Sequence, residues 1–257
     1  MTVQRSFEEL VAEGEAVPTE GWDFSWFEGR ATEERPSWGY QRAMGERMAV
    51  ARAALDIQTG GGEVLAGVGR RPPVSVATEA WPPNIAKATT LLHPLGTVVV
   101  AAPEEPPLPF GDAAFDLVVS RHPVQPYFGE IARLLRPGGT YFAQHVGPES
   151  VFELTEFFLG PLPEEAREAR QPDRERAEAE EAGLEVVRLR TERLRMEFHD
   201  VAAVVHFLRK VIWIVPGFTV AAHLPKLREL HERIGAEGPF VTYSSRTLFE
   251  ARRPGPA

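Results

Sequence analysis

The sequence contains no cysteine and no long hydrophobic run. Without cysteine among its 257 residues, the chain cannot form a disulfide, a thiolate zinc site or a cysteine nucleophile, so any metal ligands would be His or carboxylate side chains. No stretch approaches the ~18 uninterrupted apolar residues of a membrane-spanning helix, and the segment from Met1 to Glu15 is acidic rather than apolar. We therefore expect a cytoplasmic protein with no membrane partner.

The sequence also has fewer basic than acidic side chains. The chain has 28 Lys and Arg against 37 Asp and Glu, which gives a formal net charge of -9. Affinity for nucleic acid depends on clustered basic side chains that neutralise phosphates, so this balance argues against a nucleic-acid partner. The remaining composition, 43% hydrophobic and 25% charged, is ordinary for a globular protein with one core of good size.

Apolar runs alternate with helical patterns along most of the chain. Strands are expected at 54–57, 74–78, 97–101, 115–120, 140–145, 184–194 and 240–249, and helices at 38–53, 84–92, 124–135, 164–182, 200–211 and 219–234. Apolar strands that alternate with helices are typical of a sheet covered on both faces. We therefore predict the α/β class, with a doubly wound, mostly parallel sheet of about seven strands.

The predicted domain organisation adds an N-terminal cap and an insertion to the alternating strands and helices. Residues 1–53 are predicted to form an N-terminal cap and lead-in helix, and residues 54–257 the main domain. The first part of the cap is aromatic and lacks clean periodicity, so we expect it to be irregular and partly helical; its aromatic residues are Trp22, Phe24, Trp26, Phe27 and Trp38. Within the main domain, residues 199–235 are predicted to form a helical insertion before the last strand.

The strongest local signal is a glycine-rich turn directly after the first apolar strand. The turn reads Asp56-Ile57-Gln58-Thr59-Gly60-Gly61-Gly62-Glu63. Glycines let the backbone pass close to a ligand, and the helix that follows offers unpaired N–H donors. A phosphate loop is excluded because no Lys-Ser or Lys-Thr follows the glycines. The last glycine of the G-x-G-x-x-G dehydrogenase fingerprint is also missing, which argues against a nicotinamide dehydrogenase.

A second acidic residue supports a nucleoside site. Glu79 ends the next strand, 23 positions after Asp56. Doubly wound folds place a carboxylate there that accepts hydrogen bonds from ribose hydroxyls. Either feature alone fits an ordinary turn or a surface Glu, but together and in this order they predict a bound nucleoside.

At this point the sequence resembles the class I, Rossmann-like SAM-dependent methyltransferases of the common bacterial methyltransferase-domain type. The motifs that carry the resemblance are Asp56 to Gly62, Glu79, Leu108-Pro109-Phe110 with Phe115-Asp116-Leu117-Val118, and Leu134-Leu135-Arg136-Pro137-Gly138-Gly139. They cover roughly Ala53 to Val146 and say almost nothing about the methyl acceptor. The resemblance implies S-adenosyl-L-methionine (SAM) as cofactor and methyl transfer to an O, N or C atom.

The resemblance also implies which residues bind SAM. Asp56, Gly60 and Gly62 would line its methionine part, and Glu79 would hold its ribose. Thr59 in the turn is a further candidate for a cofactor contact.

Three other candidates complete the predicted cofactor site. Ser120 ends the strand at 115–120. Glu104, four positions before the Leu-Pro-Phe motif, would contact adenine, with a solvated loop Glu as the alternative. Gln58 stands where the family usually has glycine, so its side chain would either crowd the methionine tail or donate a hydrogen bond to the cofactor's carboxylate.

Two histidines are candidates for catalysis. A hydroxyl or ammonium acceptor would have to lose a proton, which requires a base near the methyl group. His122, in Ser120-Arg121-His122-Pro123, is our preferred base because this segment faces the methyl group in the fold that the resemblance implies. His145 ends the next strand. For both, the alternative is a histidine that serves packing.

Methyltransferases of this type commonly insert substrate-covering elements before the last strand, so residues 199–235 are predicted to be a lid. The candidate substrate-binding residues are Tyr40, Arg121, His206 and Trp213, although core packing also explains the apolar residues of the insertion. The predicted function is methyl transfer to a small molecule, for example in secondary metabolism. An RNA-base methyltransferase and a non-catalytic SAM-binding protein are the alternatives, and a homodimer stays open.

Overall fold

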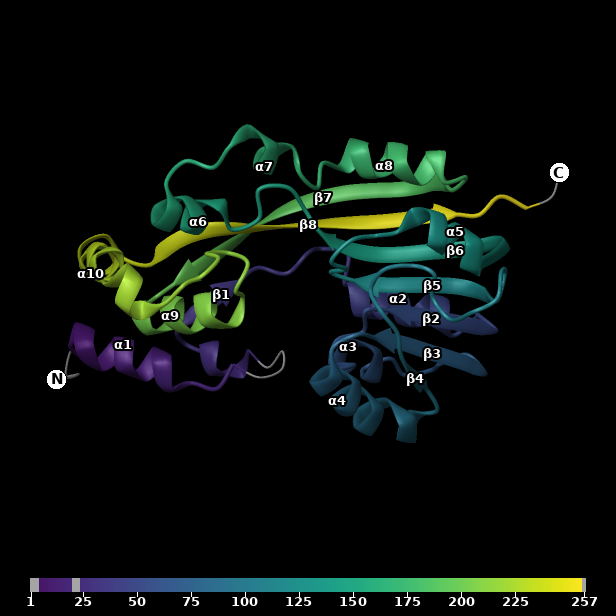
Figure 1. Cartoon of the computed structure of the whole chain (residues 1–257), viewed down its shortest axis with the longest axis horizontal. Coiled ribbons are helices and arrows are strands. Elements are labelled where there is room, and N and C mark those ends of the chain that lie inside the picture. The colour runs from purple at the N-terminus through teal and green to yellow at the C-terminus, as the bar shows by residue number, and fades with distance from the viewer. Residues whose placement is uncertain (1–4, 20–23, 256–257) are drawn as a thin grey trace. The chain divides into compact units, whose positions relative to one another are not determined.

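The computed structural model describes residues 5–19 and 24–255 (Figure 1). Trp22, one of the aromatic residues of the N-terminal segment, lies outside the described residues. In the described part of the chain, no helix is both long and apolar enough to cross a membrane.

The chain divides into two compact units. The core unit consists of residues 36–148, 170–192 and 246–257, and the accessory unit consists of residues 1–35, 149–169 and 193–245. This division differs from the predicted boundary at residue 53, because the lead-in helix groups with the core unit. The accessory unit combines the N-terminal segment with the predicted insertion at 199–235.

One sheet contains eight strands in the order β1-β7-β8-β6-β5-β2-β3-β4. The strands are β1 (Ala31–Glu33), β2 (Ala53–Ile57), β3 (Val74–Glu79), β4 (Val98–Ala101), β5 (Phe115–Arg121), β6 (Leu135–Val146), β7 (Glu185–Phe198) and β8 (Phe240–Arg252). The pairs β2–β3, β2–β5, β3–β4 and β5–β6 are parallel, whereas β6–β8 and β1–β7 are antiparallel. The doubly wound, mostly parallel sheet is thus confirmed, with β1 as a strand that the sequence did not predict.

Helices cover both faces of the sheet in the core unit. Neighbouring residues of a strand point to opposite faces, so Leu55, Val118 and Tyr141 pack with α5 (Phe128–Leu134) and α8 (Pro172–Glu181). Their neighbours Ala54, Val119 and Phe142 pack with α2 (Tyr40–Met48), α3 (Glu63–Ala66) and α4 (Pro82–Leu92). This double cover explains why the strands are apolar throughout.

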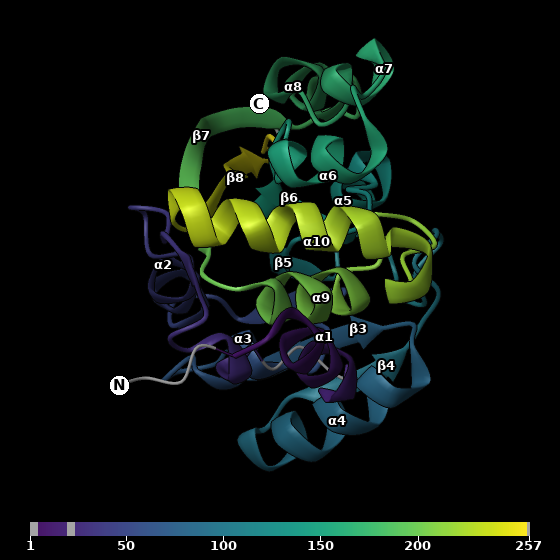
Figure 2. The ribbon, with the colours of Figure 1, turned by 90° about the vertical axis from the view of Figure 1, so that its left-hand side faces the viewer.

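The accessory unit has a hydrophobic core of its own, built mainly from helices. Its helices are α1 (Phe7–Ala16), the single turn η1 (Ser25–Phe27), α6 (Phe152–Leu159), α7 (Glu164–Glu168), α9 (Val201–Lys210) and α10 (Val220–Glu237). Figure 2 shows α1, α9 and α10 side by side. A Cβ on Gly14 would lie 2.6 Å from the carbonyl oxygen of Ala202, so glycine permits the close approach of α1 to α9.

The predicted lid includes the most buried helix of the accessory unit. Nine of the ten residues of α9 are buried, and Phe207 and Ile214 belong to the core of the unit. The packing alternative therefore accounts for these apolar residues. As predicted, Asp200 caps α9, because its carboxylate accepts a hydrogen bond from the backbone N–H of Ala203 (2.8 Å).

Several predicted boundaries are wrong for identifiable reasons. The helix expected at 124–135 begins only at Phe128, after Pro126. The helix expected at 164–182 is divided into α7 and α8, because Arg170 has a φ of 59° and Pro172 starts a new helix. The helix expected at 38–53 is confined to α2, and α6 was not predicted.

Candidate cofactor site

The candidate site lies at the carboxyl ends of β2, β3 and β5. Strand β2 is the point where the strand order reverses, because β3 lies on one side of it and β5 on the other. Doubly wound folds bind ligands at such a switch point, outside the carboxyl ends of the strands. The end of β2 pairs with the end of β5 through Ile57 and Ser120, and the glycine-rich turn follows directly.

The turn requires glycine at two positions. Gly60 and Gly62 have φ values of 64° and 82°, in the left-handed region that side chains disfavour. A Cβ on Gly62 would also lie 2.8 Å from the Cδ1 atom of Leu92. The glycines predicted from the sequence are therefore needed for the path of the backbone.

Glu79 connects the end of β3 to the turn. Its side chain is buried, and its carboxylate accepts hydrogen bonds from the backbone N–H groups of Gly60 (2.7 Å), Ala80 (3.1 Å) and Trp81 (3.0 Å). A carboxylate offers about four acceptor positions, so this one can still accept from a ligand hydroxyl. Glu79 thus both holds the glycine turn and keeps acceptor capacity at the predicted ribose position.

Asp56 is buried beneath the turn. Burial raises the pKa of its carboxyl from 3.8 to about 7; the hydrogen bond from the Thr59 hydroxyl (2.7 Å) opposes this rise, and the charge of Glu79 adds to it. At neutral pH the carboxyl is therefore close to half ionised. The structure brings the predicted residues Asp56, Thr59 and Glu79 together around one turn.

Gln58 stands at the position where the resemblance predicts glycine. Its φ is 57°, in the left-handed region that favours glycine. The side-chain Oε1 accepts a hydrogen bond from the backbone N–H of Val124 (2.7 Å). Its Nε2 is buried without a hydrogen-bond partner among the described residues, which costs free energy unless a ligand accepts from it.

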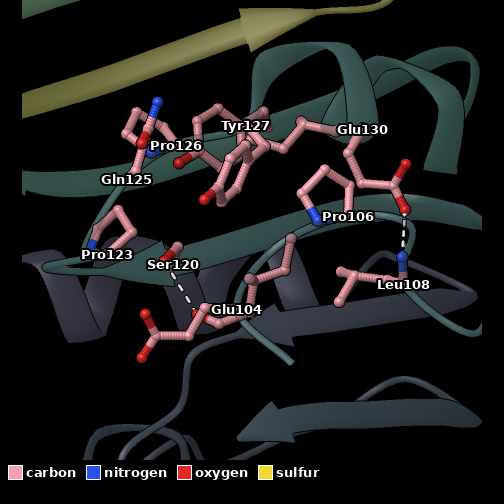
Figure 3. A pocket seen from close by; sticks show the side chains of 12 residues that line it. Glu104, Pro106, Leu108, Ser120, Pro123, Gln125, Pro126, Tyr127 and Glu130 are labelled. Atoms are coloured by element: carbon pink, nitrogen blue, oxygen red, sulfur yellow. Dashed lines mark hydrogen bonds between the residues drawn. The ribbon is translucent and has the colours of Figure 1, made fainter. Parts of the chain in front are cut away.

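A pocket opens beside these residues (Figure 3). It is lined by Ile57, Glu104, Pro106, Leu108, Ser120, Pro123, Gln125, Pro126, Tyr127, Glu130, Ile131 and Tyr141. The predicted adenine residue Glu104 is part of this lining. The carboxylate of Glu130, by contrast, is bonded within the protein, because it accepts a hydrogen bond from the backbone N–H of Leu108 (2.7 Å). A mostly apolar lining with a carboxylate suits a flat base with exocyclic N–H groups.

Some residues of the pocket could not be identified from the sequence. Tyr127 and Tyr141 line it, yet neither belongs to a recognised motif. Their only signal is that aromatic residues follow Pro126 and the Gly138-Gly139 pair. Ser120, predicted to contact the cofactor, donates its hydroxyl to the carbonyl oxygen of Ile57 (2.9 Å) and so ties β5 to β2.

His122 lies just beyond β5, at the same edge of the sheet. Its φ is 58°, and its backbone N–H donates to the carbonyl oxygen of Gln144 (2.7 Å). Its ring Nε2 lies 2.9 Å from the Nε2 of Gln144. Burial, with the positive charges of Arg121 and Arg246, holds the pKa of His122 well below 6.5, so its imidazole is neutral at pH 7.

His145 has no free ring nitrogen. Its Nδ1 lies 2.8 Å from the carboxylate of Glu175, and its Nε2 lies 3.0 Å from the hydroxyl of Tyr141. The ring is buried and stacks on Phe249. This arrangement matches the packing alternative rather than the role of a base.

The structure does not gather the four predicted substrate-binding residues in one unit. Tyr40 and Arg121 belong to the core unit, and His206 and Trp213 to the accessory unit. The hydroxyl of Tyr40 donates to the carbonyl oxygen of Ser120 (2.9 Å), which gives this buried residue a structural role. Arg121 is exposed next to His122.

The two predicted residues of the accessory unit have contrasting environments. His206 is buried, its ring stacked on Phe27 and edge-on to Trp26, whereas Trp213 is exposed. The Nδ1 of His206 is buried without a hydrogen-bond partner among the described residues. Within the described ranges, no group of three or more His, Asp or Glu residues is placed to hold a metal ion.

Comparison with known proteins relates this site to one family. Residues 55–143 match the family model described as a methyltransferase domain. No curated protein matches the sequence. The match includes the turn, Glu79 and His122, but not the accessory unit.

Solved structures with the same fold share little sequence with this chain. One, from Bacillus halodurans and provisionally described as a methyltransferase, has 18% identity and a TM-score of 0.59, covering 82% of this chain and 98% of its own. Haemonchus contortus phosphoethanolamine N-methyltransferase 2, solved with phosphomonomethylethanolamine and S-adenosylhomocysteine, has 16% identity and a TM-score of 0.52, covering 98% and 61%. The cyclase SpnF has 16% identity and a TM-score of 0.53, covering 97% and 92%.

These likenesses show the fold, and the family model shows the domain. The glycine turn, Glu79 and the pocket occupy the edge of the sheet where such a fold binds its ligand. Residues 55–143 of this chain therefore match a methyltransferase domain, within a fold that the chain shares with solved α/β structures of this kind.

Proposed function

We propose that this protein transfers the methyl group of SAM to a small-molecule acceptor. One observation carries the proposal: the glycine turn, the Glu79 carboxylate and the pocket that contains Glu104 meet at the switch point between β2 and β5. Each has the chemistry that one part of SAM requires. The acidic net charge of -9 favours a small molecule over RNA as the acceptor.

The residues present fit the cofactor. The unpartnered Nε2 of Gln58 and the half-ionised Asp56 suit the carboxylate and the ammonium group of the methionine part. Glu79 has acceptor capacity for ribose hydroxyls, and Glu104 can accept from the amino group of adenine. When bound, SAM supplies an electrophilic methyl group on sulfur, and the protein's task is to bind and align the acceptor.

The fold alone does not decide whether the protein transfers a methyl group. SpnF shares the fold and is described as a cyclase, so a SAM-binding protein without methyl transfer is the alternative. Both readings require the same cofactor site, and only an assay of transfer separates them.

Calorimetry with SAM, S-adenosylhomocysteine and NAD tests the cofactor. We expect micromolar affinity for the first two and none for NAD. Glu79→Ala should weaken binding by at least tenfold, about 1.4 kcal/mol, and Glu46→Ala, an exposed acidic residue of α2, serves as the control. Binding of NAD without SAM would refute the proposal.

Small molecules that co-purify with the protein, identified by mass spectrometry, supply acceptors for a transfer assay.

A further inference from the structure

Three buried or half-buried side chains of the core unit form a chain of hydrogen bonds that ends at His122. The indole Nε1–H of Trp38 donates to the Oε1 of Gln144 (2.8 Å), and the Nε2 of Gln144 lies 2.9 Å from the Nε2 of His122. An indole N–H can only donate, so the amide oxygen of Gln144 must face Trp38. Its amide nitrogen therefore faces His122.

This orientation determines the tautomer of His122. An amide nitrogen can only donate, so the Nε2 of His122 must be the acceptor and carry no proton. A neutral imidazole has one N–H, which must then be on Nδ1. The single lone pair of the ring is already used, so the ring acts as a donor rather than as the base predicted from the sequence.

The surroundings make this arrangement hard to reverse. Trp38 and Gln144 are 8% and 4% exposed, and the carbonyl oxygen of Gln144 also accepts the backbone N–H of His122 (2.7 Å). Turning the amide over would place two donors against each other at Trp38. A buried donor left without an acceptor costs about 1–3 kcal/mol.

The charges around His122 are mainly positive. Arg121, Arg170 and Arg246 act on its ring electrostatically, together with His145. Glu175, an acidic group of this neighbourhood, is bonded to His145 and acts on Arg170. An N–H donor in a cationic setting favours a ligand oxygen that carries negative charge.

We propose that the Nδ1–H of His122 donates a hydrogen bond to an anionic oxygen of the methyl acceptor, with Gln144 and Trp38 as positioning residues. The acceptor then belongs to the class of small carboxylates or phenolates. This inference rests on the proposed function for the identity of the ligand as a methyl acceptor, whereas the state of His122 is a property of the free protein.

Imidazole nitrogen NMR of the free protein tests the state of His122, with His122→Gln to assign its signals. At neutral pH we expect a protonated Nδ1 and an unprotonated Nε2. Gln144→Glu cannot donate, so it should move the proton to Nε2, and Trp38→Phe should produce a mixture of both tautomers. Gln41→Glu, an exposed glutamine of α2, should change neither signal. A proton on Nε2 in the wild-type protein would overturn the proposal.

Titration with benzoate and its neutral analogue benzamide tests the class of ligand. In the wild-type protein, with and without S-adenosylhomocysteine, benzoate should shift the Nδ1–H signal of His122 and benzamide should not. In Gln144→Glu the affinity for benzoate should fall at least tenfold. Equal responses to the two probes, or none to benzoate, would refute an anionic acceptor. If S-adenosylhomocysteine fails to bind, the proposed function fails while the tautomer result still stands.

Discussion

Asp56 is a buried acid at the candidate cofactor site. Because burial raises its pKa to about 7, the carboxyl loses its proton only as the pH rises through neutrality. The ammonium group of the methionine part of SAM, the cofactor that we propose, would favour the ionised form. Ionisation rises from roughly one tenth at pH 6 to nine tenths at pH 8, so the affinity for S-adenosylhomocysteine should rise about tenfold over that range. Calorimetry at both pH values checks this, and Asp56→Asn should bind more weakly without this dependence.

Gln58 offers a second test at the scale of one residue. Gln58→Gly and Gln58→Ala both remove the hydrogen bond to the backbone N–H of Val124, but only alanine keeps a Cβ at a φ of 57°. The glycine variant should therefore be more stable than the alanine variant by about 1 kcal/mol, the cost of a side chain in the left-handed region. Urea unfolding measures the difference. If the two variants are equal, the position is not strained.

At the scale of elements, the glycine turn packs closely against α4 through Gly62 and Leu92. Gly62→Ala would bring a Cβ within 2.8 Å of Leu92 and place it at a φ of 82°. We expect this variant to lose roughly 1–3 kcal/mol of stability and most of its cofactor affinity. Gly62→Ala combined with Leu92→Ala relieves the clash but not the backbone strain. Its destabilisation should therefore be smaller than the sum of the two single changes, and additive effects would contradict the contact.

At the scale of the whole molecule, His206 makes stability depend on pH. Burial, with the charges of Lys210 and Arg209, lowers its pKa from 6.5 to about 4. The unfolded chain takes up the proton first, so stability present above pH 6.5 is lost as the pH falls towards 4. Relative to His206→Phe, the wild-type protein should lose about 3 kcal/mol between pH 7 and pH 4. Chemical denaturation at both values measures this, and a constant difference would show that His206 keeps its ordinary pKa.

Local signals in the sequence predicted most of the fold and pointed to residues that the structure brings together at the candidate cofactor site. The helix cap Asp200, the glycine turn and Glu79 at a strand end depend on turn chemistry and on residue periodicity, which operate over a few neighbouring positions. The alternation of strands and helices likewise predicted that the core strands are mostly parallel.

Tertiary structure alone decided the details that bear on mechanism. The hydrogen bond from Trp38 to Gln144 joins residues 106 positions apart, and it determines whether His122 can act as a base or as a donor. Likewise, the burial of α9 follows from its packing with α1 rather than from its own pattern. Periodicity identifies an apolar face but not its partner, so roles that depend on distant contacts became visible only once the chain was folded.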